Sequence, residues 1–200
     1  MFYDTDVWPQ LDNESLWIYD KLILSRKLGY KCGPCGVPVP YAADYIVRPI
    51  INLEGQGKGT EKLWIEHGTW HLKFGYFWQE IFAGRHLSID YHKGSQLRCT
   101  EGFREHKSFV HFTRWILVDE KPKLPLIVQD ITTQYDDVNI EMIGGNVIEL
   151  HLRKNKDFDD GAIEVIPVWE DRQNSRPENF FYVEDTDDER PRLGLYKRYE

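Results

Sequence analysis

The sequence lacks the features that direct a protein to a membrane, an oxidising compartment or a nucleic acid. No apolar run approaches the roughly 20 residues that a membrane-spanning helix needs, and the acidic first residues exclude a secretory signal peptide. Three cysteines are too few for a disulfide scaffold in a chain of 200 residues. Lys and Arg number 25 against 33 Asp and Glu, and the net charge of −8 argues against sequence-independent binding to a phosphate backbone. We therefore expect a cytoplasmic protein that binds neither membranes nor nucleic acid.

Aromatic side chains, in contrast, are abundant and make up 14% of the chain. With 41% hydrophobic and 29% charged residues, the composition is that of a folded protein rather than a disordered one. This length is enough for one compact domain or for two small lobes around a shared cleft. We expect residues 1–170 to form a minimal domain with lobes over about 14–75 and 76–170, and 171–200 to be a polar C-terminal extension.

Hydrophobic periodicity and turn residues predict an α+β fold with mostly antiparallel strands. Helices are expected over residues 14–28 and 124–137. Gly144 and Gly145 predict a tight hairpin between strands over 138–143 and 146–153. The other strands are expected at 45–52, 62–67, 76–82, 86–92, 106–119 and 162–169.

Residues 32–35 spell CGPC, the letters of a thioredoxin-type redox motif. That motif requires a following helix whose N-terminus stabilises a thiolate, and Pro38 and Pro40 exclude a helix there. A structural zinc site needs four ligands, commonly as two close pairs, and Cys99 has no second cysteine near it. We interpret Cys32 and Cys35 as incidental thiols in a turn.

A glycine-rich loop follows the first predicted strand. Gly55, Gly57 and Gly59 alternate, and such glycines let the backbone approach a ligand closely and point its N–H groups at phosphate oxygens. Lys58 adds a cation inside the loop, and Arg48 adds another from the strand. The spacing is not that of a Walker loop, and no helix follows as in a Rossmann turn. A plain hairpin turn and a salt-bridged arginine are the alternatives.

The predicted hairpin carries two carboxylates. With a two-residue turn, Glu141 is expected opposite Ile148, so that Glu149 is its diagonal neighbour. His151 and Arg153 follow Glu149 at every second position. Two carboxylates without a counterion repel each other, so a divalent cation is a physical reason to bring them together. The alternative is an amphipathic hairpin with a solvated face.

Between these two motifs, an aromatic strand ends in Gln79 and Glu80 and continues through a turn to His86. A purine base requires an apolar slot with a few backbone and amide partners, and a ribose requires a donor or acceptor at the rim of that slot. This segment can supply both, so we expect it to bind a nucleoside.

In this order, the three segments resemble the motifs of the ATP-grasp superfamily. The resembling stretches are YIVRPIINLEGQGKGT (45–60), FWQEIFAGRHLSID (77–90) and IEMIGGNVIELHLR (140–153). The stretch YDKLILSRKLGYKCGPCGVPVP (19–40) is similar to the segment that precedes these motifs in the family. The resemblance covers residues 19–155 and implies two small α+β lobes, with mostly antiparallel sheets, around a nucleotide cleft.

The resemblance also implies ATP and Mg²⁺ as cofactors. The metal ligands would be Glu141, Glu149 and His151, which stands where the family usually has Asn. The ATP-binding residues would include Arg48, which replaces the usual Lys, and the loop residues Gly55, Gly57, Lys58 and Gly59. Gln79 and Glu80 would lie at the adenine hinge, and His86 stands where a ribose-binding Glu is common. The catalytic cations would be Arg48, Lys58 and Arg153, which would neutralise charge as the γ-phosphoryl group moves.

The activity implied by the resemblance is that of a carboxylate–amine ligase acting through an acylphosphate. Family enzymes usually carry an N-terminal domain that helps to hold the carboxylate, whereas here the resemblance begins near residue 19. The substrate site would then be completed by a partner chain or a second copy, or the substrate would be a protein or peptide. Two alternatives are a nucleotide-binding or interaction module without catalysis and a kinase that uses the same cleft. The sequence also resembles small ATP-grasp-like proteins of bacterial viruses, which would place it in the cytoplasm of a bacterial host.

Overall fold

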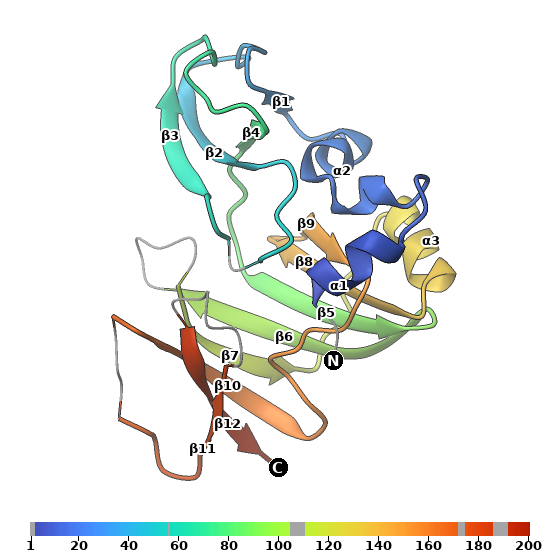
Figure 1. Ribbon diagram of the computed structural model, residues 1–200, viewed down its shortest axis with the longest axis vertical. Coiled ribbons are helices and arrows are strands. Elements are labelled where there is room, and N and C mark those ends of the chain that lie inside the picture. The colour runs from blue at the N-terminus through green and yellow to red at the C-terminus, as the bar shows by residue number, and fades with distance from the viewer. Residues whose placement is uncertain (1–2, 56, 105–110, 172–174, 186–191) are drawn as a thin grey trace.

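The computed structural model describes residues 3–55, 57–104, 111–171, 175–185 and 192–200, which form two sheets (Figure 1). The small sheet has four strands in the order β1-β4-β2-β3, and the large sheet has eight in the order β11-β12-β10-β7-β6-β5-β8-β9. The strand pairings of the described residues are antiparallel. The predicted α+β class is therefore confirmed.

The small sheet contains strands from the first 80 residues. Its members are β1 (Cys32–Pro34), β2 (Ala43–Pro49), β3 (Glu61–Ile65) and β4 (Tyr76–Glu80). The chain crosses to the large sheet only after Glu80, so β4 lies with the first lobe although the expected boundary was at residues 75 and 76. The pairing of β4 with both β1 and β2 holds it there.

The large sheet includes strands that the sequence did not predict. Its members are β5 (His86–His92), β6 (Ser95–Arg104), β7 (Phe112–Val118), β8 (Asp137–Ile143), β9 (Asn146–His151), β10 (Ala162–Trp169), β11 (Phe181–Glu184) and β12 (Arg192–Tyr199). No strand was predicted at β1, β6, β11 or β12. Of the strand predicted over 106–119, residues 106–110 lie outside the described residues.

Strand β12 shows why a polar segment can be an interior strand. Arg192 is 5% exposed and pairs with Asp157 at 2.6 Å and with Asp185 at 2.7 Å. Lys197 is 4% exposed and lies 3.1 Å from Asp159. Because these cations are buried by pairing rather than excluded from the sheet, the strand lacks the apolar alternation that predicts a strand from sequence.

The predicted helix over 14–28 is wrong as a single element. The structure has a 3-10 helix, η2 (Leu16–Tyr19), followed by α2 (Lys21–Lys27). Asp20 separates them with an extended backbone, and its side chain accepts a hydrogen bond from the backbone N–H of Ile23 at 2.7 Å. Asp20 is thus the N-cap of α2, a role that favours a helix start over a helix interior.

The remaining helices are short. They are α1 (Asp4–Val7), η1 (Trp8–Gln10) and α3 (Leu126–Gln134), which begins after Pro125 and lies within the range predicted from sequence. Among the described residues, no helix is both long and apolar enough to cross a bilayer.

Alternation along β5 divides the large sheet into an apolar face and a polar face. The apolar residues of β5, which join α3 in the main core cluster, are Leu87, Ile89 and Tyr91. The intervening residues, which are buried but polar, are His86, Ser88 and Asp90. Because side chains of a strand point alternately to opposite faces, the polar set of β5 shares one face of the sheet with Asn139 and Glu141 of β8, which pair with Asp90 and Ser88.

The segment between β4 and β5, residues 81–85, links the two sheets and packs against the turn of the β8–β9 hairpin. Gly84 has a φ of +121°, and Gly144 donates its N–H to the carbonyl of Arg85 at 3.0 Å. A Cβ at Gly144 would lie 1.9 Å from the Ala83 carbonyl oxygen, whereas a Cβ at Gly145 would contact nothing within 4 Å. The backbone at Gly144 therefore lies so close to the linking segment that only glycine fits at this position.

Gly144→Ala is expected to destabilise the fold more than Gly145→Ala. Both glycines have positive φ, so each substitution should cost about 1–2 kcal/mol of backbone strain. Only Gly144→Ala adds the overlap with Ala83, for which we expect about 2 kcal/mol more. Urea unfolding of the two variants measures the difference, and equal losses would mean that the link moves aside without cost.

Candidate functional site

A cleft of about 210 Å³ lies where the two sheets meet. The small sheet contributes Arg48 from β2 and Gln79 and Glu80 from β4. The polar face of the large sheet contributes Glu141 and Glu149. The cleft thus brings together residues from all three sequence motifs.

The two carboxylates face each other directly across β8 and β9. Glu141 pairs with Glu149, while Met142 pairs with Val147, so a bulge leaves Ile148 outside the register. The predicted diagonal arrangement is therefore wrong, because the added residue shifts the register by one beyond the turn. The carbonyl of Ile148, at this bulge, accepts a hydrogen bond from Arg48 Nη2 at 3.1 Å.

A lysine and a histidine from other elements hold this carboxylate pair. Lys21 Nζ lies 2.8 Å from Glu149 Oε1, and His86 Nε2 lies 3.1 Å from Glu141 Oε2. Burial would raise the pKa of Glu141, but the hydrogen bond to His86 and the neighbouring His151 and Lys21 together lower the pKa below its ordinary value. Lys21 is 5% exposed and was not predicted as a site residue, although the DK pair of the segment before the motifs marks its position.

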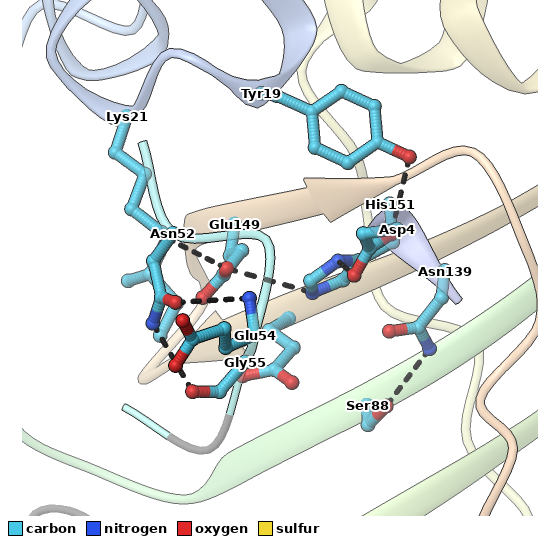
Figure 2. A network of polar contacts seen from close by, with 12 residues as sticks. Asp4, Tyr19, Lys21, Asn52, Glu54, Gly55, Ser88, Asn139, Glu149 and His151 are labelled. Atoms are coloured by element: carbon cyan, nitrogen blue, oxygen red, sulfur yellow. Dashed lines mark hydrogen bonds and ion pairs between the residues drawn. The ribbon is translucent and has the colours of Figure 1, made fainter. Parts of the chain in front are cut away.

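The N-terminal segment holds the end of the final motif (Figure 2). Asp4, which is 1% exposed, accepts hydrogen bonds from His151 Nδ1 at 2.8 Å and from Arg153 Nε and Nη2 at 3.0 and 2.7 Å. Tyr19 donates its hydroxyl to the same carboxylate at 3.1 Å. Sequence reasoning did not identify Asp4, because nothing local connects residue 4 with residue 151.

Asp4 and His151 shift each other's pKa. Burial would raise the pKa of Asp4, but His151 and Arg153 lower it well below its usual range. Burial would lower the pKa of His151, but Asp4 raises it. His151 Nε2 lies 3.7 Å from Glu149 Oε1, so a series of polar contacts joins Lys21, Glu149, His151 and Asp4, as Figure 2 shows.

The predicted nucleotide-binding residues carry buried polar atoms without partners. Arg48 donates from Nη2 to Gln79 Oε1 at 2.7 Å. In the described part of the chain, Arg48 Nε, Gln79 Nε2 and His86 Nδ1 are buried and have no hydrogen-bond partner. Burial also lowers the pKa of Arg48, against the attraction of Glu149 and Glu141. The predicted adenine-hinge residue Glu80 lines the same cleft, and its side chain accepts from the backbone N–H of Lys31 at 2.9 Å.

Of the described loop residues 54–60, Glu54, Gly55, Gly57 and Thr60 line the cleft, whereas Lys58 and Gly59 do not. Lys58 forms an ion pair with Glu54. A Cβ at Gly59 would lie 2.7 Å from the Tyr76 hydroxyl, so Gly59 serves packing against β4.

Asn52 shapes the loop from within, and the sequence did not single it out. Its Nδ2 donates to the Gly55 carbonyl at 3.1 Å, and its Oδ1 accepts from the Glu54 backbone N–H at 3.1 Å (Figure 2). Hydrogen bonds from an Asn side chain to the backbone of residues two and three positions later in the chain are typical of a turn. Asn52 and Glu54 both line the cleft.

The CGPC motif lies in the small sheet rather than at a helix start. Cys32 is the first residue of β1 and pairs with Gln79, so residues 32–34 form a strand where a turn was expected. All three cysteines are free thiols. Burial raises the pKa of Cys32, the opposite of what a redox-active thiolate requires.

Comparison with known proteins identifies the fold. No protein-family model and no curated protein matches the chain. Among solved structures, a protein of Archaeoglobus fulgidus described as an ATP-grasp superfamily protein matches with a TM-score of 0.54 at 14% identity, over 92% of this chain and 64% of its own. This chain has the ATP-grasp fold.

Two enzymes match this ATP-grasp fold equally well. N5-carboxyaminoimidazole synthetase from Staphylococcus aureus has a TM-score of 0.54 at 9% identity, over 92% of this chain and 67% of its own. Carboxyaminoimidazole ribonucleotide synthase from Aspergillus clavatus, solved with ATP, has a TM-score of 0.54 at 9% identity, over 92% of this chain and 68% of its own. The chain therefore spans about two thirds of the length of these proteins and 64% of the Archaeoglobus protein.

The donor atoms of the ATP-grasp cleft fit Mg²⁺ carried by a nucleotide. Within the described residues, no three His, Cys, Asp or Glu side chains converge as a complete metal site. Mg²⁺, however, is usually held by one or two carboxylates, with phosphate oxygens and waters as its other ligands. Glu141 and Glu149 offer two carboxylates in the cleft, and His151, with Nδ1 bound to Asp4, has only Nε2 for a metal.

Proposed function

We propose that the chain binds Mg-ATP in the cleft and uses it to join a carboxylate to an amine. The observation that carries the proposal is the set of unpartnered buried atoms, Arg48 Nε, Gln79 Nε2 and His86 Nδ1, on residues lining one cleft. A buried polar atom without a partner costs free energy, and a nucleotide would supply the missing partners. The ATP in the Aspergillus enzyme supports the same ligand.

Each part of the cleft has a role in this proposal. Glu141 and Glu149 would hold Mg²⁺, which supplies positive charge beside the phosphates when bound. Gln79 would present its amide to the base, and His86 would present Nδ1 to the ribose. Arg48 would donate from Nε to a phosphate oxygen, because its Nη2 is already used by Gln79 and Ile148.

The proposed reaction has two steps. The γ-phosphoryl group moves to a carboxylate oxygen, which releases ADP and forms an acylphosphate. The amine then attacks the acyl carbon and phosphate leaves. Arg48 and Arg153 supply fixed positive charge where negative charge develops, and Lys58 would contribute only after leaving Glu54. The carboxylate and the amine are proposed to come from small molecules or from a peptide.

A nucleotide-binding module without ligation is the second candidate. It is favoured by the internal pairing of the reactive groups, because Asp4 holds Arg153 through two hydrogen bonds and Lys21 holds Glu149. In such a module ATP would bind without transfer of its phosphoryl group. ADP release in the presence of candidate carboxylates and amines separates the two functions.

Arg48→Met is expected to weaken Mg-ATP binding at least tenfold, measured by titration calorimetry. The substitution removes the donor that we place on a phosphate oxygen, and charge-assisted hydrogen bonds of this kind are worth about 1.5–3 kcal/mol. Lys62→Met is the matched control, because Lys62 is a cation on the neighbouring strand β3 that pairs with Asp44 outside the cleft. Equal affinities of both variants and the unaltered chain would contradict the nucleotide site.

A further inference from the structure

A buried asparagine lies beside the carboxylate pair and has no role in the predicted site. Asn139 of β8 is 2% exposed, and it lines the cleft. It stands two residues before Glu141, so both side chains project from the same face of the sheet. In the strand pairing Asn139 is opposite His151, as Glu141 is opposite Glu149. The four side chains therefore form two neighbouring pairs on one face of the hairpin.

Hydrogen bonds fix the direction in which the Asn139 amide points. Its Nδ2 donates to Ser88 Oγ at 2.8 Å and to Asp90 Oδ1 at 2.9 Å, and both acceptors are on β5. Exchange of the amide nitrogen and oxygen would set two acceptor oxygens, Asn139 Oδ1 and Asp90 Oδ1, against each other. Figure 2 shows Nδ2 turned toward Ser88 and Oδ1 turned away from it. In the described part of the chain Oδ1 accepts no hydrogen bond, so this oxygen is available to a ligand in the cleft.

The groups behind Asn139 are themselves held in place. Asp90 is 1% exposed and accepts hydrogen bonds from Arg98 Nε at 2.6 Å and from the backbone N–H of Asn155 at 2.8 Å. Ser88 Oγ also accepts from Asn155 Nδ2 at 3.2 Å. Such contacts behind a side chain orient it for metal binding and tune the affinity of the site. The oxygen of Asn139 is thus preorganised.

His151, the other member of the pair, offers a different donor atom. Its Nδ1 lies 2.8 Å from Asp4 Oδ2, and its Nε2 lies 3.7 Å from Glu149 Oε1. The ring can therefore offer a cation only nitrogen, whereas Asn139 offers oxygen. Mg²⁺ takes oxygen ligands, and imidazole is more typical of Zn²⁺, Cu²⁺, Fe²⁺ and Ni²⁺ sites.

We propose that Asn139, and not His151, is the third side chain that holds the divalent cation. Asn139 Oδ1 joins the carboxylates of Glu141 and Glu149 in a set made only of oxygen atoms. Phosphate oxygens of the nucleotide and water supply the other ligands that Mg²⁺ needs. This inference rests on the proposed function, because it assigns a ligand to the cation in the same cleft.

Mn²⁺ in place of Mg²⁺ is the probe, and calorimetry of the full chain measures the affinity for a non-hydrolysable ATP analogue with and without this metal. The factor by which Mn²⁺ tightens binding should fall at least about tenfold in Asn139→Leu. The affinity for the metal-free analogue should stay unchanged. A purely structural role of Asn139 would instead lower both affinities, and that result would overturn the proposal.

Two further variants separate the oxygen from the rest of the side chain. Asn139→Asp keeps an oxygen at this place but loses the donor to Ser88 and Asp90, so it should keep the tightening by Mn²⁺. Asn146→Leu is the matched control, because Asn146 begins β9 of the same hairpin and does not line the cleft. Loss of the Mn²⁺ effect in Asn139→Asp, or an equal loss in Asn146→Leu, would contradict a metal-binding oxygen at residue 139.

Pulsed electron paramagnetic resonance of Mn²⁺ bound to the unaltered chain with the analogue identifies the ligands without a variant. We expect no coupling to an imidazole nitrogen, and such a coupling would overturn the proposal. If Mn²⁺ tightens binding equally in the unaltered chain and in Asn139→Leu, this inference alone fails. If the unaltered chain does not bind the analogue with Mn²⁺, the proposed function fails and the inference fails with it.

Discussion

Glu149→Gln is expected to reduce ATP-dependent ADP release by about 100-fold or more, the size of effect seen when one preorganised electrostatic group is removed. The substitution keeps the volume of the side chain but removes one of the two negative charges of the Glu141–Glu149 pair. Lys21 then faces a neutral amide, and only Glu141 keeps the charge that we propose for holding Mg²⁺. ADP release is measured with a coupled assay, and calorimetry with ATP in the presence and absence of Mg²⁺ shows whether the metal dependence is lost.

Asp44→Asn is the control for this experiment. Asp44 is also a carboxylate paired with a lysine, Lys62, at 2.7 Å, but it lies on β2 outside the cleft. Its substitution should leave ADP release unchanged. If Glu149→Gln kept ADP release within threefold of the unaltered chain, the assignment of Glu149 to the metal would fail.

Asp4→Ala is expected to lower the free energy of unfolding by about 3 kcal/mol or more, because removing one partner of a buried ion pair leaves an uncompensated charge. Asp4 is buried and hydrogen-bonded to two basic side chains, His151 and Arg153, and to a tyrosine hydroxyl. Among the described residues of the N-terminal segment, Asp4 is the carboxylate to which these groups are hydrogen-bonded. Urea unfolding of the variant and of the unaltered chain measures the loss.

Two comparisons show whether the loss comes from the ion pair. Asp6→Ala removes the same charge from the same helix at an exposed position, so it should cost less than about 1 kcal/mol. The double variant of Asp4→Ala with Arg153→Ala should be more stable than the sum of the single losses predicts. Additive losses would mean that Asp4 and Arg153 do not stabilise each other.

Local patterns predicted most of the elements from which the cleft is built. Apolar alternation located β5, β8 and β10, and paired glycines located the hairpin turn. These patterns depend on residues close together in the chain, and the structure keeps that local order. The same reasoning missed β6 and β12, whose charged or glycine-interrupted sequences become strands only by pairing with neighbours on both sides.

Within the cleft, the sequence located the carboxylates but not their arrangement. The spacing of Glu141 and Glu149 about a two-residue turn predicted diagonal neighbours, and a bulge at Ile148 makes them a direct pair. A bulge has no distinct sequence signature here. The bulge is contacted from another sheet, by the hydrogen bond from Arg48 to the carbonyl of Ile148.

The sequence by itself determined the α+β class, the three ordered motifs and some of the polar residues that line the cleft, such as Arg48, Glu141 and Glu149. Only the tertiary structure decided that Asp4 holds His151 and Arg153, and that Lys21 holds Glu149. The physical reason is that motif spacing reflects local backbone geometry. Burial and charge pairing instead join groups as far apart as residues 4 and 151, and no local pattern encodes which of them will meet.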